Sequence, residues 1–111
     1  MEIEVSDHDG VLAIAPQGRL DSNSAPELEE LLLGRIESGN TKMIVDFSAI
    51  HYVSSAGLRV LLMAAKRTRA ANGSFAIHSM SDTIREIFDI SGFLSIFSVY
   101  SSLDEALRHT G

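Results

Sequence analysis

Two adjacent serines, Ser54 and Ser55, stand between an apolar run and an amphipathic run of the chain. Residues 43–47 are typical of a buried strand, and residues 58–71 have the spacing of a helix. At the start of a helix, unpaired backbone N–H groups and the helix dipole favour an anion. A serine hydroxyl there is either a helix cap or an acceptor for a phosphate group. From these residues alone, the cap is the more common role.

Enzyme chemistry at these serines is the first alternative. Ser55-Ala56-Gly57 matches half of the G-x-S-x-G nucleophile motif, but Val53 replaces its first glycine. A chain of 111 residues is too short for the usual hydrolase sheet, and no aspartate followed by histidine is placed to complete a triad. There is no glycine-rich phosphate loop, and the histidines lack the spacing of metal ligands: His8, His51, His78 and His109. We therefore expect a protein that is not an enzyme, with no metal and no cofactor.

The composition fits a single domain, residues 1–111, with one core. The formal net charge is −6, which disfavours nucleic-acid binding because phosphate contacts need a basic surface. The chain has no cysteine, and this fits a reducing compartment. Residues 1–5 lack the basic and apolar regions of a signal peptide, and no apolar run reaches the roughly 18 residues of a membrane span. We expect a cytoplasmic protein without direct membrane insertion.

Hydrophobic periodicity predicts an alternation of strands and helices. Ser24 and Glu27 have the spacing of a capping box, with Pro26 in the first turn, and Ser102 and Glu105 repeat that spacing near the end. In chain order, the expected elements are strands 2–5 and 11–15, a helix 24–39, a strand 42–47, a helix 55–72, a strand 74–78, a helix 81–92, a strand 96–99 and a helix after 102. This order, β-β-α-β-α-β-α-β-α, predicts an α/β fold with a mixed sheet of about five strands, about four helices and right-handed crossovers.

Apolar stripes indicate which helix faces enter the core. In the helix 55–72, the core stripe is Leu58, Leu61, Leu62 and Ala65. A second stripe on this helix is either an extra core contact or, where exposed, a partner surface: Ala56, Val60, Met63 and Ala70. The two C-terminal helices are expected to point six residues inward: Ile84, Ile87, Phe88, Leu103, Ala106 and Leu107.

Four local motifs match one protein family, in the family's own order and across essentially the whole chain. They are Gly18-Arg19-Leu20-Asp21, Ile44-Val45-Asp46-Phe47, Val53-Ser54-Ser55-Ala56-Gly57-Leu58 and Ile87-Phe88-Asp89-Ile90-Ser91-Gly92-Phe93. They resemble, in turn, the G-x-L-D turn, the central strand, the D-S-[SAT]-G-L signature and the L-F-x-x-[ST]-G-[LF] segment of the STAS domain. The chain therefore resembles a STAS domain, the fold of anti-sigma factor antagonists.

The resemblance implies a switch in protein binding. In that family an ATP-binding serine kinase, itself an anti-sigma factor, phosphorylates the signature serine. The unphosphorylated antagonist captures the kinase and frees a sigma factor, the phosphorylated form releases the kinase, and a phosphatase resets the cycle. Alignment on Gly57-Leu58 carries the phosphorylated serine onto Ser55. Ser54 stands where the family often has aspartate, so it is a second acceptor. The family also leads us to expect a monomer when the protein is alone.

The expected partner-binding residues surround this serine: Asp21, Ser54, Ser55, Ala56, Gly57, Arg59, Val60 and Met63. The resemblance implies that Asp21 lies beside Ser55, since both follow strand ends at one edge of the sheet. Arg59 lies one helical turn after Ser55 and is expected to reach a phosphate or an acidic partner group. Asp46, within a strand, is expected to be a hydrogen-bonded structural carboxylate. The alternative within the family is a docking subunit of a lipid or anion transport system, or of a sensory scaffold, without phosphorylation.

Overall fold

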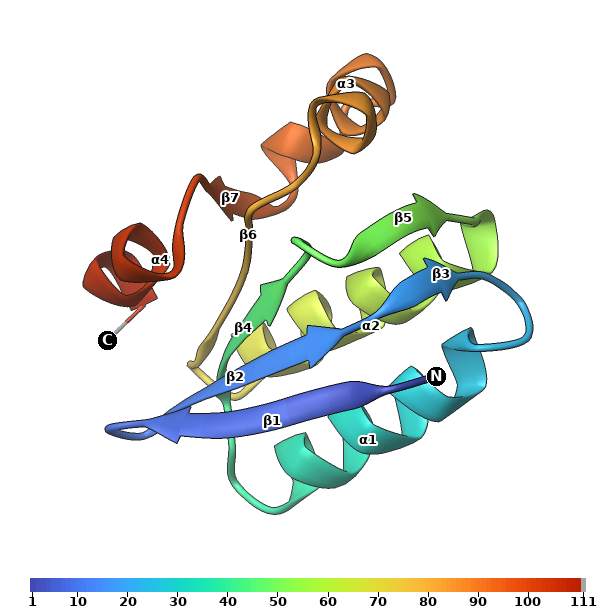
Figure 1. Ribbon diagram of the computed structural model, residues 1–111. Coiled ribbons are helices and arrows are strands. Elements are labelled where there is room, and N and C mark those ends of the chain that lie inside the picture. Colours follow the sequence, from blue (N-terminus) through green and yellow to red (C-terminus); the bar gives the residue numbers. More distant parts are fainter. Residues whose placement is uncertain (111) are drawn as a thin grey trace.

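Five strands form one mixed sheet in the order β1-β2-β4-β6-β7 in the computed structural model, which describes residues 1–110 (Figure 1). The strands are β1 (Ile3–His8), β2 (Val11–Pro16), β4 (Lys42–Asp46), β6 (Ser74–His78) and β7 (Ser98–Tyr100). β1 is antiparallel to β2, and the other neighbours are parallel. The α/β class and the predicted order of the main elements are confirmed.

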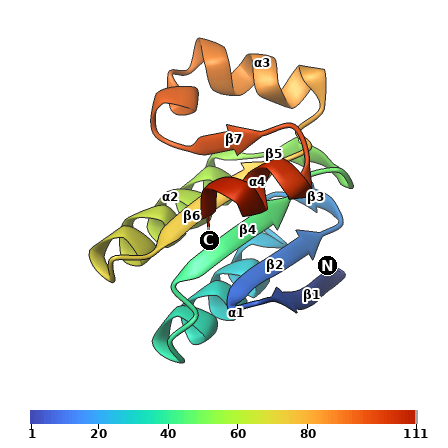
Figure 2. The ribbon, with the colours of Figure 1, turned by 90° about the vertical axis from the view of Figure 1, so that its left-hand side faces the viewer.

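Helices cover both faces of this sheet. The helices of residues 1–110 are α1 (Ala25–Glu37), α2 (Ser55–Ala70), α3 (Asp82–Ile90) and α4 (Leu103–Thr110), with a short 3₁₀ turn, η1 (Phe93–Ser95), after α3. In β4, Met43 and Val45 belong to the main core with α1 and α2, whereas Ile44 faces the other way and packs with Ala106 of α4. This alternation places α4 opposite α1 and α2 (Figure 2). None of the helices in residues 1–110 combines the length and apolar character needed to cross a bilayer.

A second, small sheet was not predicted. β3 (Gly18–Leu20) and β5 (Ile50–Val53) pair in parallel, with Leu20 opposite Val53. Each strand is too short to carry a hydrophobic period of its own, so the sequence pattern indicates only loops there. The pair extends from the ends of β2 and β4 to the start of α2, and it therefore determines where the adjacent serines lie.

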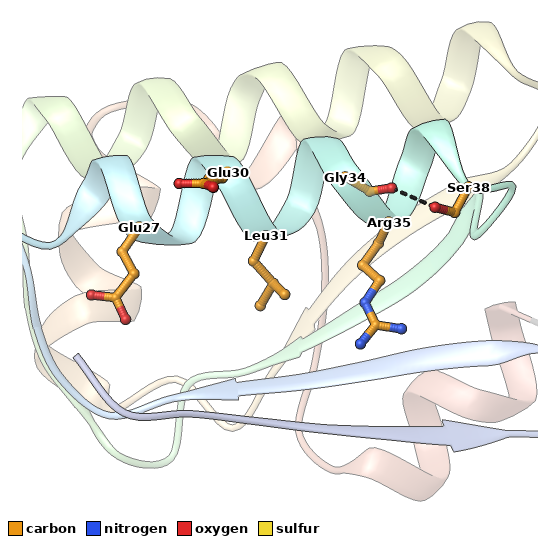
Figure 3. Close-up of a pocket in the computed structure, with 6 residues that line it drawn as sticks. All are labelled: Glu27, Glu30, Leu31, Gly34, Arg35 and Ser38. Atoms are coloured by element: carbon orange, nitrogen blue, oxygen red, sulfur yellow. Dashed lines mark hydrogen bonds between the residues drawn. The ribbon is translucent and has the colours of Figure 1, made fainter.

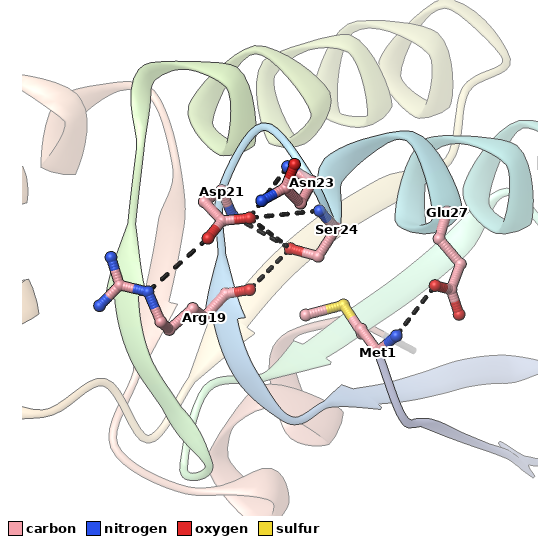
Figure 4. Close-up of polar contacts among 6 residues, drawn as sticks. All are labelled: Met1, Arg19, Asp21, Asn23, Ser24 and Glu27. Carbon is pink, nitrogen blue, oxygen red and sulfur yellow. Dashed lines mark hydrogen bonds and ion pairs between the residues drawn. The ribbon is translucent and has the colours of Figure 1, made fainter.

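The capping box predicted at Ser24 and Glu27 is wrong, although the helix begins there. The Ser24 hydroxyl donates to the carbonyl of Arg19 at 2.6 Å and accepts the Asp21 N–H at 3.0 Å, so it caps no N–H of α1. Glu27 instead pairs with the N-terminal amine of Met1, 2.9 Å away (Figure 4). The Ser24 hydroxyl therefore fixes the turn between β3 and α1.

The second predicted box forms in part. The Ser102 hydroxyl accepts the Glu105 N–H at 3.2 Å. The Glu105 carboxylate, however, accepts from the N–H of Ser101, one residue earlier than the motif requires, at 3.3 Å.

Two predictions in the C-terminal third are corrected. Ile87 is 52% exposed rather than inward-facing, because α3 lies at the edge of the sheet and buries only the narrow stripe of Ile84 and Phe88. The last strand begins at Ser98 rather than Ile96, since residues 93–95 form the 3₁₀ turn. Leu103, Ala106 and Leu107 contact the sheet as predicted.

Candidate functional site

The two serines at the start of α2 have different surroundings. Ser54 is the N-cap: its backbone is extended and its hydroxyl accepts the N–H of Gly57 at 3.3 Å. Its own N–H donates to the carbonyl of Leu20, 2.8 Å away. Ser55 is the first residue of the helix and is exposed. The capping function thus belongs to Ser54, which is half-buried, and Ser55 is the more accessible serine of the pair.

The first turn of α2 contains no acidic side chain. No carboxylate within that turn therefore balances the positive end of the helix dipole. A negative charge added at Ser55 would lie beside this end and beside N–H groups that the helix leaves unpaired. The local electrostatics are compatible with an anionic group at this position.

Gly57 is buried and lets α2 approach β3 closely. A Cβ atom at this position would lie 2.8 Å from the carbonyl oxygen of Leu20 and 2.7 Å from its Cγ. Only glycine fits this contact without a shift of α2 or β3. Gly57 therefore has a packing role inside the fold, and the expectation that it contributes to partner binding stays a prediction.

Asp21 lies at the same edge as the serines, as expected. The paired residues Leu20 and Val53 are followed directly by Asp21 and Ser54. The Asp21 carboxylate accepts the backbone N–H groups of Asn23 at 3.0 Å and Ser24 at 3.3 Å. The Asn23 hydrogen bond is the largest of the effects that hold the pKa of Asp21 below its usual value. The group is therefore a fixed carboxylate beside the start of α2.

Arg19 and Tyr52 form a pair that the sequence did not indicate. They are opposite each other in the β3–β5 register, and the Arg19 guanidinium carbon lies 4.2 Å from the centroid of the Tyr52 ring. Arg19 Nε is 3.6 Å from Asp21 Oδ2 (Figure 4). The pairing depends on the register of two short strands, for which no periodic signal exists in the sequence.

The remaining residues of the predicted surface divide by burial. Arg59 is exposed, and Ala56 and Met63 are half-buried against the main core. Val60 is only 4% exposed, because α2 packs against α1 as well as the sheet and so buries a wider face. Val60 is therefore a core residue in this structure, with little surface for a partner to contact.

Asp46 has structural contacts, as predicted. Its Oδ1 accepts the Ser48 N–H at 2.8 Å and lies 4.0 Å from Nδ1 of His78. His78 is buried, with Nδ1 also 2.8 Å from the Ser79 hydroxyl. Desolvation lowers the pKa of His78, and the Asp46 charge opposes this shift. These contacts involve no residue at the start of α2.

A broad surface hollow of about 570 Å³ lies along α1, lined by Glu27, Glu30, Leu31, Gly34, Arg35 and Ser38 (Figure 3). In that view Glu27, Leu31 and Arg35 point from one side of the helix. Its lining includes none of the residues predicted for the site. The hollow is therefore separate from the serine site.

Comparison with known proteins gives a consistent result. Residues 2–106 match the family model of the STAS domain. BtrV of Bordetella bronchiseptica, a protein assigned to the anti-sigma factor antagonists, is 38% identical over 106 residues, which are 96% of this chain and 91% of BtrV.

Two solved structures share the fold. TM1081 of Thermotoga maritima, assigned to the same class, has a TM-score of 0.93 at 18% identity, covering 97% of this chain and 93% of its own. SpoIIAA of Bacillus in its phosphorylated form has a TM-score of 0.77 at 21% identity, covering 97% and 98%.

Proposed function

The chain belongs to the STAS domain family, and we propose that it is an anti-sigma factor antagonist whose partner binding is controlled at Ser55. Unmodified, it captures an anti-sigma factor that is a serine kinase, and a sigma factor is released. Phosphorylated at Ser55, it dissociates from the kinase, and a phosphatase restores it. The protein regulates transcription through protein contacts rather than by catalysis.

The accessibility of Ser55 is the observation that carries this proposal. A kinase must reach the hydroxyl, and Ser55 is exposed while its neighbour Ser54 supplies the cap. Modification at Ser55 therefore leaves in place the hydrogen bond that the Gly57 N–H donates to the Ser54 hydroxyl. The switch can operate without dismantling the start of α2.

Release follows from the charge that phosphorylation adds. A phosphoserine carries about −1.5 to −2 charges at neutral pH, together with three acceptor oxygens. At this position the helix dipole tolerates the charge, whereas a partner packed over Ser55 must desolvate or repel it. The phosphorylated form of SpoIIAA supports this in one respect, because that fold accommodates a phosphate group.

We propose one domain, residues 1–111, that is cytoplasmic and monomeric when alone. Arg59, exposed one turn after Ser55, reaches either the phosphate or an acidic group of the kinase. Equal kinase affinity and equal phosphorylation rate for Arg59→Ala would contradict this role of Arg59.

A phosphorylation assay tests the switch directly. The purified protein is added with Mg-ATP to an extract of its native cells, and the phosphate is mapped by peptide mass spectrometry. We expect phosphate on Ser55 and none in Ser55→Ala. Phosphate on Ser54 would support the same mechanism with Ser54, rather than Ser55, as the phosphorylated residue. No phosphate on either serine, in an extract active on other substrates, would favour the unphosphorylated docking subunit instead.

Two variants then test release, using the kinase purified by this activity. Ser55→Ala removes the acceptor, so its complex with the kinase should persist when ATP is added. Ser55→Asp adds a charge at the same position and should bind poorly. If both variants bound and dissociated as the wild type does, Ser55 would not control the complex.

A further inference from the structure

We propose that Arg19, held between the Tyr52 ring and the Asp21 carboxylate, binds an acidic side chain of the kinase and contributes to its selection. The proposal rests on the function proposed above and names a residue outside the signature motif. It concerns the unmodified protein, before any phosphate is added.

The first ground is that Arg19 is positioned before a partner arrives. Its guanidinium carbon is 4.2 Å from the Tyr52 ring centroid, and its Nε is 3.6 Å from Asp21 Oδ2. Asp21 is itself fixed by the N–H groups of Asn23 and Ser24. Since a long side chain that is already ordered loses less entropy on binding, Arg19 is suited to an interface.

The second ground is that Arg19 can still bind another group. Its side chain is 64% exposed, and its contact with Asp21 uses Nε. Figure 4 shows the two terminal nitrogens directed away from Asp21. A planar guanidinium with free terminal nitrogens matches a carboxylate, which can accept two parallel hydrogen bonds. Arginine and tyrosine are also the residue types enriched among energetically dominant interface positions.

The third ground is the location of the pair. Arg19 is opposite Tyr52, and Ser55 follows Tyr52 by three residues at the start of α2. Arg59 adds a second exposed cation one turn into the helix. In a chain of net charge −6, the charged side chains named here are two cations and one carboxylate, so positive charge is in excess among them. An acidic surface is therefore the complementary partner chemistry.

This charge arrangement also connects Arg19 to the switch. A phosphate on Ser55 adds about −1.5 to −2 charges, which exceeds the excess of one positive charge among Arg19, Arg59 and Asp21. An acidic partner surface that is attracted to the unmodified protein is then repelled. The reversal of sign gives a physical cause for release that does not need a change of fold.

The test measures affinity and phosphorylation kinetics with the kinase purified by its activity on Ser55. We expect Arg19→Ala to weaken the complex by about tenfold and Arg19→Glu by more. Arg19→Lys should be intermediate, because it keeps the charge without the planar fork. Tyr52→Phe should match the wild type, whereas Tyr52→Ala should lose several-fold in affinity. The loss should appear in KM for the protein substrate, with kcat unchanged, and should shrink as NaCl is raised.

Arg69→Ala is the matched control. Arg69 is exposed near the C-terminal end of α2, about 20 Å from Ser55 along the helix axis. The Arg69→Ala variant should bind as the wild type does. Normal phosphorylation of Ser55 with unchanged affinity in both Arg19→Ala and Arg19→Glu would overturn the role of Arg19 alone. If Arg19→Ala changed the affinity of the phosphorylated protein alone, the proposed role would also be overturned, because Arg19 would then bind the phosphate group rather than the kinase. Absence of any kinase acting on Ser54 or Ser55 would overturn both proposals.

Discussion

Ser54 and Ser55 have separate tasks, although they are adjacent and chemically identical. The hydroxyl of Ser54 stabilises the start of α2 through the N–H of Gly57, while Ser55 projects from the first helical position. We predict that Ser54→Ala lowers the free energy of unfolding by about 1 kcal/mol, the usual value of an N-cap. Ser55→Ala should change it far less. Urea unfolding of the two variants measures both, and equal losses would contradict this division.

His78 provides a prediction about pH at the same scale. Burial lowers its pKa in the folded protein, so the unfolded chain takes up a proton first as the pH falls. The stability contributed by neutral His78 is therefore fully present above the ordinary histidine pKa of about 6.5 and is lost as the pH falls toward the lower folded pKa. The Asp46 carboxylate, whose Oδ1 is 4.0 Å from His78 Nδ1, partly opposes the lowering of the pKa and so reduces the difference between the folded and unfolded pKa values.

We predict that the free energy of unfolding falls as the pH is lowered through and below the ordinary histidine pKa of about 6.5, and falls less steeply in His78→Gln. The slope is the quantity to compare, since the substitution also alters packing. His51→Gln is the control, because His51 is exposed. An identical slope in His78→Gln and the wild type would exclude His78 as the source.

At the scale of single elements, the approach of α2 to β3 depends on one glycine. Alanine normally favours a helix over glycine by about 1 kcal/mol. At Gly57 the added Cβ would lie 2.8 Å from a backbone oxygen of Leu20, so the strain should exceed this gain. We predict that Gly57→Ala costs about 1–3 kcal/mol. Gly34, within α1, has open space around the corresponding atom, and Gly34→Ala should stabilise by about 0.5–1 kcal/mol.

Thermal unfolding of these two variants gives a comparison within one protein. Gly57→Ala should lower the midpoint temperature of unfolding, and Gly34→Ala should raise it. A stabilising Gly57→Ala would mean that α2 can move away from β3 at little cost. In that case the close packing beneath Ser54 and Ser55 would not position the site.

The elements also explain which features the sequence could predict. Helices and strands with a full hydrophobic period were assigned in the correct order, and the motif 53–58 located the junction before α2. The β3–β5 pair was missed because its strands are too short for a period. The sequence left open whether Val60 lies in the core or at the surface, and it placed Ile87 inward, because the burial of each depends on how many neighbours its helix has in the assembled fold.

At the scale of the whole molecule, the site is assembled from separate parts of the chain. Leu20 accepts the N–H of Ser54, and Arg19 rests on Tyr52, so residues more than thirty positions apart form one surface. Local periodicity carries no information on such pairs. The family motif identified Asp21 and Ser55 individually, whereas the contact of Arg19 with Tyr52 required the register of the folded sheet.

The whole fold should tolerate a phosphate group on Ser55. Ser55 is exposed, its neighbour holds the cap, and the first turn of α2 has no acidic side chain, so a phosphate meets the positive end of the helix without breaking a described contact. We predict that the protein phosphorylated on Ser55 keeps its fold and gains about 0.3–1 kcal/mol of stability at low salt, declining as salt is added.

Chemical unfolding at two salt concentrations measures this gain, and amide NMR spectra measure its extent. Shifts should be confined to the start of α2 and the adjacent ends of β3 and β5. Protein phosphorylated on Ser54 alone is the informative comparison, since modification there would disturb the cap. If phosphorylation of Ser55 instead destabilised the domain or shifted resonances across the main sheet, release would arise from a conformational change, and the charge mechanism proposed for Arg19 and Ser55 would be wrong.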